Sequence, residues 1–355
     1  HLDYSTHSVP QATRDLALGD PRAIAWTPNG TRGYVAGLGS NNVVEIDASG
    51  ARTGAPIEVG EGPTGLAVAG GRLYVLNRFD SSISVVDRST LQETQRVPLH
   101  DATPAASRDG RKHLYGTHEG SGLGHVSCAS CHVDGRMDRL SWDLGDPSGS
   151  LGSLAGQKLG MSLHGLHTGF SAVHPMKGPM TTQTLQDIIG KEPLHWRGDR
   201  DGLEDFDEAF RLLQGADRAL GPVEMQEFED FLATIHFPPN PLRDFDNSLP
   251  ASVDLTGFES VGRFSPAGTQ LPDGDPNAGL SDYTTLALDG AFRCVTCHTL
   301  PTGMGADVRR IGGIYQDIAP GPDGEHHHAL VSVDGSTQRA FKVPQTRNVL
   351  EKSGF

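Results

Sequence analysis

Short apolar runs separated by turn residues recur along residues 1 to about 120. The first copy contains the runs Pro21 to Ala25, Gly33 to Ala36 and Asn42 to Asp47. The second copy follows about 40 residues later, with the runs Pro63 to Val68, Leu73 to Leu76 and Ser82 to Asp87. Short β-rich runs bounded by Gly, Asn and Asp at this period are typical of propeller blades built from about four strands.

A third, degraded copy is expected to begin at Pro104 and to reach His113-Leu114-Tyr115. Two and a half blades cannot close a ring, since propellers have about 4–8 blades. The pattern therefore predicts an incomplete propeller whose other blades are missing on the N-terminal side or are supplied by further chains. A small open sheet packed on the next domain is the alternative.

Two later stretches change to helical periodicity. Leu203, Phe206, Phe210 and Leu213 recur at spacings of three and four, which predicts a helix. Apolar residues from Met225 to Ile235 predict a second helix, with Pro222 near its start and Pro238 and Pro239 beyond its end. We interpret the aromatic stripes as core or pocket lining, and residues 240–290 as a linker and loops.

Composition and charge limit the function classes. The chain has 355 residues, enough for two or more domains, and a formal charge of −15. This charge excludes nucleic acid and anionic membranes as favoured partners, and it favours a basic partner protein as well as solubility. No run of 18 apolar residues is present, so no segment is predicted to span a bilayer.

All four cysteines belong to two copies of one pentapeptide, C-x-x-C-H. The copies are Cys128-Ala129-Ser130-Cys131-His132 and Cys294-Val295-Thr296-Cys297-His298. This spacing lets two thiols add to the two vinyl groups of one porphyrin and places an imidazole under the iron. We predict two covalently bound haem c groups, with His132 and His298 as proximal ligands. Two zinc or dithiol sites, or two disulfides, are the alternatives.

The ligand on the opposite face of each iron decides between electron transfer and peroxide or oxygen chemistry. For the first haem the candidates are His164, His167, His174, Met176 and Met180. For the second haem they are Met304 and the run His326-His327-His328, which we interpret primarily as an exposed loop. The natural second ligand could also lie beyond Phe355. Asp199 to Asp207 is a weak candidate for calcium, and solvated carboxylates explain it equally well.

The fold class predicted from these patterns is mixed: a partial β-propeller-like N-terminal region followed by two mainly α-helical cytochrome c-type haem domains. The propeller-like blades are assigned to residues 1–120, the first haem domain to 121–240 and the second to 241–355. We expect the second domain to be truncated, because little chain follows its motif. Covalent haem attachment takes place outside the cytoplasm, so the motifs predict a periplasmic or extracellular location.

Residues from about 105 to 355 resemble the bacterial di-haem cytochrome c peroxidase and MauG superfamily. The matching stretches are Ser127 to His132, His174 with Lys177-Gly178-Pro179, Thr182 to Leu185 with Trp196 and Leu203, and Phe341 to Pro344 with Arg347-Asn348-Val349. The Tyr-Val and Val-Val-Asp runs upstream are similar to YVTN β-propeller repeats. Members that combine the two parts are the nearest resemblance.

This resemblance implies that His174 is the distal ligand of a peroxidatic haem and that Glu204 is a catalytic acid–base residue. The sequence departs from the family pattern at several places: one residue fewer lies between His174 and Lys177, Leu194 replaces a pocket Gln, and the family's W-D-G-R is altered to Trp196-Arg197-Gly198-Asp199-Arg200. Read without the family, Glu204 is a charged residue at the start of a helix, where it would stabilise the helix dipole.

Three functions follow from the sequence. The first is electron transfer by a di-haem c-type cytochrome outside the cytoplasm. The second is an enzyme that reduces peroxide or oxidises a bound substrate at the first haem, with Glu204 moving protons. The third is a structural role, in which the blades dock a larger assembly and the haems conduct electrons within it.

Overall fold

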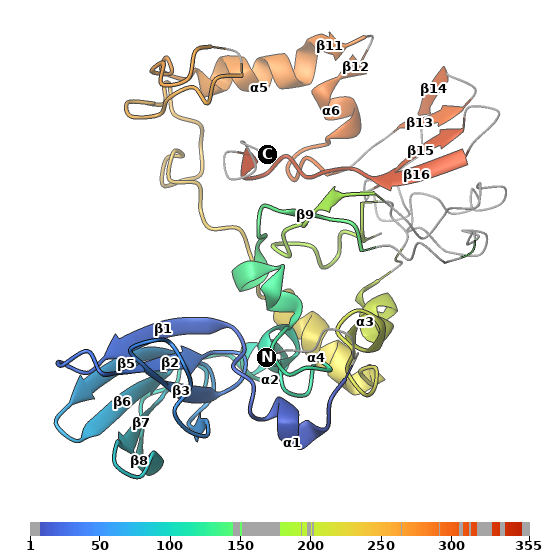
Figure 1. Cartoon of the computed structure of the whole chain (residues 1–355). Helices are drawn as coiled ribbons and strands as arrows, with labels where there is room; N and C mark the ends of the chain where they lie inside the picture. Colours follow the sequence, from blue (N-terminus) through green and yellow to red (C-terminus); the bar gives the residue numbers. More distant parts are fainter. Residues whose placement is uncertain are drawn as a thin grey trace. The chain divides into compact units, whose positions relative to one another are not determined.

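The computed structural model describes residues 8–144, 150, 178–192, 194–196, 200, 202–263, 265–290, 292–304, 308–311, 314–317, 329–333 and 338–349 (Figure 1). The chain divides into two compact units. Unit 1 contains His1–Leu140, Thr182–Ile189 and Leu203–Ile235, and unit 2 contains Ser141–Thr181, Gly190–Gly202 and His236–Phe355. One C-x-x-C-H motif lies in each unit.

Two four-stranded antiparallel sheets form the N-terminal part of unit 1. The first contains β1 (Pro21–Trp26), β2 (Arg32–Gly37), β3 (Asn42–Asp47) and β4 (Ile57–Glu58). The second contains β5 (Pro63–Ala69), β6 (Arg72–Asn77), β7 (Ser82–Asp87) and β8 (Gln92–Pro98). Each sheet keeps its strands in chain order, as propeller blades do. The two predicted blades are confirmed as strand meanders, and they are consistent with a partial propeller-like region.

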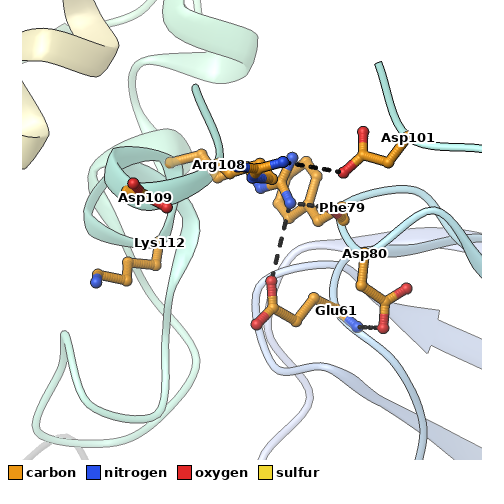
Figure 2. A pocket seen from close by; sticks show the side chains of 8 residues that line it. Glu61, Phe79, Asp80, Asp101, Arg108, Asp109 and Lys112 are labelled. Atoms are coloured by element: carbon orange, nitrogen blue, oxygen red, sulfur yellow. Dashed lines mark hydrogen bonds and ion pairs between the residues drawn. The ribbon is translucent and has the colours of Figure 1, made fainter. Parts of the chain in front are cut away.

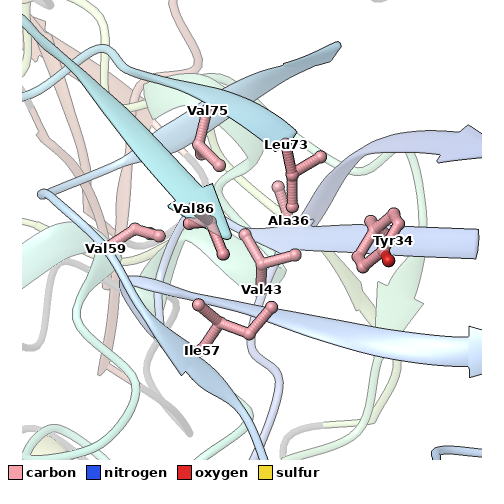
Figure 3. Packing of buried hydrophobic residues seen from close by; sticks show 8 residues of the cluster. All are labelled: Tyr34, Ala36, Val43, Ile57, Val59, Leu73, Val75 and Val86. Carbon is pink, nitrogen blue, oxygen red and sulfur yellow. The ribbon is translucent and has the colours of Figure 1, made fainter. Parts of the chain in front are cut away.

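A single apolar core joins the two blades (Figure 3). It contains Tyr34, Ala36, Val43, Ile57 and Val59 from the first blade and Leu73, Val75 and Val86 from the second, all of them buried. Period-2 alternation produces it: along β6, Leu73, Val75 and Asn77 are buried, while the residues between them are exposed. The blades are therefore held together face to face by branched apolar side chains.

The predicted third copy of the repeat is wrong. Residues 105–115 form helix α2 (Ala105–Tyr115), which begins directly after Pro104. Its sequence contains no β-branched residue, whereas the blade strands are rich in Val and Ile. The buried positions Gly110, Arg111, His113 and Leu114 follow helical spacing, and α2 packs against helix α4.

The predicted helices of unit 1 are confirmed, with shorter bounds. The first is divided into a 3-10 turn, η4 (Leu203–Phe206), and α3 (Asp207–Leu212). The second is α4 (Pro222–Leu232), with Pro222 in its first turn, where a missing N–H costs nothing. The Glu224 side chain accepts a hydrogen bond from the Gly221 N–H at 2.9 Å and pairs with Arg218, which lowers the pKa of Glu224 to about 2. A short helix, α1 (Gln11–Arg14), precedes the blades.

Unit 2 contains shorter elements. The sheet pairs are β9 (Ser141–Trp142) with β10 (Met180–Thr181) and β11 (Ala287–Asp289) with β12 (Phe292–Arg293). A four-stranded sheet contains β13 (Val308–Ile311), β14 (Ile314–Asp317), β15 (Ala329–Val333) and β16 (Gln338–Lys342). The predicted linker also contains a helix, α5 (Pro276–Thr285), started by Asp275, whose carboxylate accepts from the Ala278 N–H at 2.9 Å.

The sequence-based fold class is thus supported for the N-terminal sheets. The division at residues 120 and 240, and the mainly helical character of two haem domains, stay predictions. Within the described part of the chain, no helix is long and apolar enough to cross a membrane, as the sequence predicted.

Candidate haem-attachment sites

The first C-x-x-C-H motif forms a tight turn in unit 1. Cys128–Ser130 is the 3-10 helix η1, and the His132 N–H donates to the Cys128 carbonyl at 2.9 Å. The Ser130 hydroxyl accepts from the Ser127 N–H at 3.0 Å and fixes the start of the turn. A second 3-10 helix, η2 (Val133–Gly135), follows at once.

The second motif forms an equivalent turn in unit 2. Cys294–Cys297 is the short helix α6, and the His298 N–H donates to the Cys294 carbonyl at 2.9 Å. None of the four cysteines is in a disulfide. Both motifs therefore place two free thiols and one imidazole on a single helical turn, which is the arrangement that two thioether bonds and one axial ligand require.

Both motif imidazoles are held in the same way. Nδ1 of His132 lies 2.8 Å from the Gln183 carbonyl oxygen, and Nδ1 of His298 lies 2.8 Å from the Gly303 carbonyl oxygen. A carbonyl can only accept, so Nδ1 carries the proton and Nε2 of the neutral ring carries the lone pair. Metal-bound histidines typically have this outer hydrogen bond. The donor set of each motif therefore fits a covalently bound haem.

The segment that contains Gln183 is pinned to the first motif by its backbone. The Leu185 N–H donates to the Gly135 carbonyl at 2.9 Å, and the Asp187 N–H donates to the Ile235 carbonyl at 2.8 Å. These bonds fix the Gln183 carbonyl beside His132, although the two residues are 51 positions apart. The proximal imidazole is thus oriented by chain that returns from far along the sequence.

Gln214 lies against the first thiol. Its Nε2 lies 3.4 Å from Cys128 Sγ, and its own carbonyl accepts from the Gly122 N–H at 2.9 Å. Burial raises the pKa of the Cys128 thiol to about 11, and the Gln214 amide opposes this shift. The pKa of Cys131 is also raised by burial. Burial therefore disfavours the thiolate form of both cysteines.

An ion-pair cluster joins the first blade to the motif turn. Arg22, on β1, pairs with Asp20 at 2.8 Å and with Asp134 of η2 at 2.9 Å. Tyr115, at the end of α2, lies near these charges, and burial raises its pKa to about 12. The blade is therefore attached directly to the segment that follows His132.

The turn that contains His298 is held by close contacts on several sides. The Tyr283 hydroxyl donates to the His298 carbonyl at 2.6 Å and lies 3.5 Å from Thr346 Oγ1. Gly303 has a left-handed backbone, with φ of 68°, and a Cβ added there would lie 1.8 Å from Thr346 Oγ1. Only glycine fits at this position, so the loop that presents the Gly303 carbonyl to His298 is locked by the chain after Phe341.

Two segments that carry the family resemblance lie together in unit 2. The Lys342 N–H donates to the Trp196 carbonyl at 3.0 Å, and the Trp196 indole N–H donates to the Thr181 carbonyl at 2.8 Å. The buried Lys342 ammonium donates to the Lys191 carbonyl. Burial lowers the pKa of Lys342 to about 8.

The remaining sequence-predicted ligands are only partly placed. His164, His167, His174, Met176 and the run His326 to His328 lie outside the described residues. Met180 is half-buried on β10 in unit 2. Met304 is buried and directly follows Gly303, so its backbone begins on the Nδ1 side of the His298 ring, away from Nε2. All of these ligand assignments stay predictions.

The predicted acid–base residue Glu204 is exposed in the first turn of η4. Part of the Asp199 to Asp207 cluster, including Asp199 and Asp201, lies outside the described residues. Among the residues that are described, no group of three or more His, Cys, Asp or Glu side chains could hold a metal ion. The catalytic role of Glu204 and the calcium site stay predictions.

A charged hollow of about 420 Å³ lies where α2 meets the loops of the second blade (Figure 2). The Arg111 guanidinium lies over the Phe79 ring at 4.7 Å, donates to the Phe79 carbonyl and lies 3.9 Å from Glu61. Arg108 lies 4.0 Å from Asp101. Most of the charged side chains that line the hollow face opposite charges within unit 1. We therefore interpret the hollow as the place where the second blade packs against helix α2.

Sequence reasoning found the motif residues and missed the groups that orient them. No motif assigns a role in orienting the imidazoles or thiols to these groups, which belong to Gln183, Gly303, Tyr283 and Gln214. Gly303 offered one signal, since a Gly shortly after a C-x-x-C-H indicates a left-handed turn that could return a carbonyl to the imidazole. Gln183 lies in the matching stretch Thr182 to Leu185, but that match does not predict its contact with His132, because the contact depends on the folded path of the chain.

The chain was compared with known proteins. No protein-family model matches it, and no curated protein matches it. Among solved structures, it is similar to the hydrazine synthase of Kuenenia stuttgartiensis, with 28% identity over 28% of each chain and a TM-score of 0.23. It is similar to apo AztD from Citrobacter koseri, with 20% identity over 22% of this chain and 23% of that one and a TM-score of 0.21.

A third similar structure is the dihydro-heme d1 dehydrogenase NirN in complex with DHE. The identity is 25%, over 24% of this chain and 18% of that one, with a TM-score of 0.20. In all three cases this chain spans less than a third of the length of the solved chain that it matches.

Proposed function

We propose that the protein is a c-type cytochrome that binds two haem groups covalently and transfers electrons outside the cytoplasm. Cys128, Cys131 and His132 hold the first haem, and Cys294, Cys297 and His298 hold the second. The observation that carries this proposal is that the two motifs have the same local structure. In each, free thiols lie on one turn, and Nδ1 of the histidine faces a backbone carbonyl at 2.8 Å.

When bound, haem supplies reversible one-electron exchange at its iron. The residues of this chain orient the two motif histidines and strengthen them as donors. The Gln183 and Gly303 carbonyls keep Nδ1 protonated, orient each ring and make Nε2 a stronger donor. The Tyr283 hydroxyl and the packed Thr346 prevent the His298 turn from moving, which reduces structural change when an electron arrives or leaves.

The location and the partner follow from the same proposal. Thioether attachment requires export from the cytoplasm, so we place the protein in the periplasm or outside the cell. A chain with a formal charge of −15 attracts a basic redox partner at low ionic strength. Its electron-exchange rate with a basic carrier is expected to fall as salt is added.

A direct experiment tests the attachment. The holoprotein is denatured and extracted with acid–acetone, and the polypeptide is then weighed. Retention of the colour and a mass increase of two porphyrins are expected. Loss of all colour to the solvent, or bound zinc in place of pigment, would overturn the proposal.

A di-haem peroxidase or MauG-like oxidase is the second candidate. It is favoured by the bond between Lys342 and Trp196, which joins two segments of the family resemblance. In this case His174 would be a displaceable ligand of the first haem, and Glu204 would move protons. The third candidate, a structural subunit that conducts electrons within an assembly, needs the same haems and no peroxide turnover.

Replacement of His174 by Gly separates the first two candidates. If His174 is the distal ligand, the H174G variant should change the first haem from low spin to high spin, because an axial imidazole is lost. Absorption spectra of each haem, with and without peroxide, measure this change and the turnover together. An unchanged spectrum would rule out His174 as a ligand. Absence of peroxide turnover with several electron donors would rule out the peroxidase function.

Gly303→Ala should raise the midpoint potential of the second haem by tens of millivolts. The new Cβ collides with Thr346 Oγ1, so the loop must move and the bond from His298 Nδ1 to the Gly303 carbonyl weakens. A less electron-rich imidazole stabilises oxidised iron less. Spectroelectrochemical titration measures the shift.

Gly290→Ala is the matched control for this prediction. Gly290 is also left-handed, with φ of 60°, but a Cβ there meets no atom within 4 Å. Its backbone strain is comparable, and its potential should stay at the wild-type value. Equal shifts in G303A and G290A would mean that the proximal carbonyl does not tune this haem.

A further inference from the structure

Arg22, on strand β1 of the first blade, bridges two carboxylates with one guanidinium. Its Nε lies 2.8 Å from Asp20 Oδ1, and its Nη2 lies 2.9 Å from Asp134 Oδ1. Nη1 also donates to Asp134 Oδ2 at 3.2 Å, so the contact with Asp134 is bidentate. Asp20 is fixed to the blade, because its carbonyl accepts from the Leu38 N–H at 2.9 Å. A planar fork makes this bridge, whereas a lysine ammonium would act as one point charge.

The blade presents Arg22 through an irregularity in its first strand. Arg22 is the extra residue of a β-bulge, because Pro21 and Ala23 pair with consecutive residues of β2. A bulge of this kind re-aims a side chain. The second blade has the same bulge, with Thr64 as its extra residue. The first blade therefore places a cation at a position where the second blade has a neutral side chain.

The other end of the bridge is the turn that directly follows the first axial histidine. Asp134 lies two residues after His132 and has a left-handed backbone, with φ of 52° and ψ of 37°. Gly135 is also left-handed, with φ of 72°, and its N–H donates to the His132 carbonyl at 2.9 Å. Asp adopts this conformation more readily than most residues, but surrounding contacts still have to select it. The bond to Arg22 is such a contact.

This turn is connected to the imidazole by two further hydrogen bonds. The Gly135 carbonyl accepts from the Leu185 N–H at 2.9 Å. Two residues before Leu185, the Gln183 carbonyl lies 2.8 Å from Nδ1 of His132. All of these residues belong to unit 1. A change in the η2 turn would therefore move the segment that carries the carbonyl acceptor of the imidazole.

We propose that Arg22 is a positioning residue of the first haem site: through Asp134 and the η2 turn it holds the Gln183 carbonyl against Nδ1 of His132. The inference rests on the proposed function, because the orientation of the imidazole affects a redox potential only when iron is bound. Loss of the bridge loosens the bond at Nδ1, which makes Nε2 a weaker donor and favours reduced iron. The first blade thereby helps to set the potential of the first haem.

Charge and position can be separated by the choice of variants. Removal of Arg22 alone leaves two unpaired carboxylates, and their negative charge stabilises oxidised haem, which opposes the loss of positioning. Arg22→Met combined with Asp134→Asn removes one positive and one negative charge. The net charge of the cluster is then the same as in the wild type, so a shift in potential reports the lost positioning.

Spectroelectrochemical titration of the R22M/D134N holoprotein measures both haems in one sample. At a fixed potential, the ratio of reduced to oxidised first haem should rise about threefold, a shift of about 30 mV for one electron. Complete loss of an outer hydrogen-bond partner typically changes metal affinity or activity by about 10–100-fold, and here the bond is loosened rather than removed. The second haem should not shift. Hydrogen exchange of the Leu185 amide should be faster than in the wild type.

An arginine of the second blade provides the matched control. Arg96, on β8, lies 2.9 Å from a Glu93 carboxylate oxygen and 3.6 Å from one of Asp80, so it too is held by two carboxylates. The R96M/E93Q variant should leave both potentials and the exchange of Leu185 at their wild-type values. Arg22→Lys keeps the charge but loses the fork, so it should shift the first haem in the same direction by less. R22K also carries the test if R22M/D134N does not fold.

The possible outcomes distinguish this inference from the proposed function. If both haems are attached and the first potential is unchanged or lower in R22M/D134N and R22K, the positioning role is overturned and the proposed function stands. An equal shift in R96M/E93Q, or a raised potential with unchanged exchange of Leu185, also overturns the positioning role. A wild-type polypeptide whose mass shows no covalent haem overturns both.

Discussion

Serine at both Cys128 and Cys131 is expected to remove one covalently bound haem and to leave the other attached. A serine hydroxyl fills nearly the same space as a thiol but does not add to a porphyrin vinyl group under the conditions of haem attachment. The turn itself should survive, because it is held by the backbone bond from His132 to Cys128 and by the Ser127–Ser130 contact. The denatured polypeptide should therefore lose the mass of one porphyrin.

The second motif is the internal control for this experiment. It lies in the other compact unit and forms its own turn, from Cys294 to His298. Its haem should remain, which shows that export and attachment still work in the variant. Serine at Cys294 and Cys297 should give the reciprocal result, and the four-serine chain should be colourless. Two haems retained in either double variant would contradict the assignment of the motifs.

The spectra of the two double variants should also separate the haems. Each variant keeps one iron, so its midpoint potential and spin state can be assigned without overlap. This assignment makes the effect of Gly303→Ala specific, since the shift must appear in the C128S/C131S chain and be absent from the chain that keeps only the first haem. The H174G spectrum is resolved in the same way with the second motif removed.

The sequence predicted the blades because their signal is local. Short runs that contain Val, Ile, Leu or Tyr recur about 40 residues apart, and Asp47 and Asp87 stand at equivalent turns, where Ser49 and Ser89 donate to their carboxylates. The third copy failed for a physical reason. Leu114-Tyr115 matched the repeat, but the run from Ala105 to Tyr115 lacks β-branched residues and places buried side chains at helical spacing.

The motif turns could also be predicted, but their environment could not. A C-x-x-C-H sequence identifies the thiols and the imidazole, because their spacing is the chemical requirement. It does not identify the acceptor at Nδ1, since Gln183 reaches His132 only after the chain returns past Gly135 and Ile235. Thr346 is a similar case, because its close approach to Gly303 is visible only in the fold.

Gly110→Ala is expected to destabilise unit 1. Helix α2 crosses α4 at Gly110, where an added Cβ would lie 2.0 Å from the Glu227 carbonyl oxygen and 2.5 Å from Phe231 Cβ. Neither atom can rotate away, so the helices must separate. Overpacking of this kind costs about 1–3 kcal/mol, and the better helix propensity of Ala returns only about 1 kcal/mol.

The expected result is a lower urea midpoint and a Tm lower by about 2–4 °C for each net kcal/mol lost. Because α2 also packs on the η1 turn, the spectrum of the first haem should change before that of the second as urea rises. Gly279→Ala is the matched control: Gly279 lies within helix α5, and a Cβ there meets nothing within 4 Å. That variant should be as stable as wild type or slightly more so. If G110A matches G279A, the close contact between α2 and α4 does not support the first haem site.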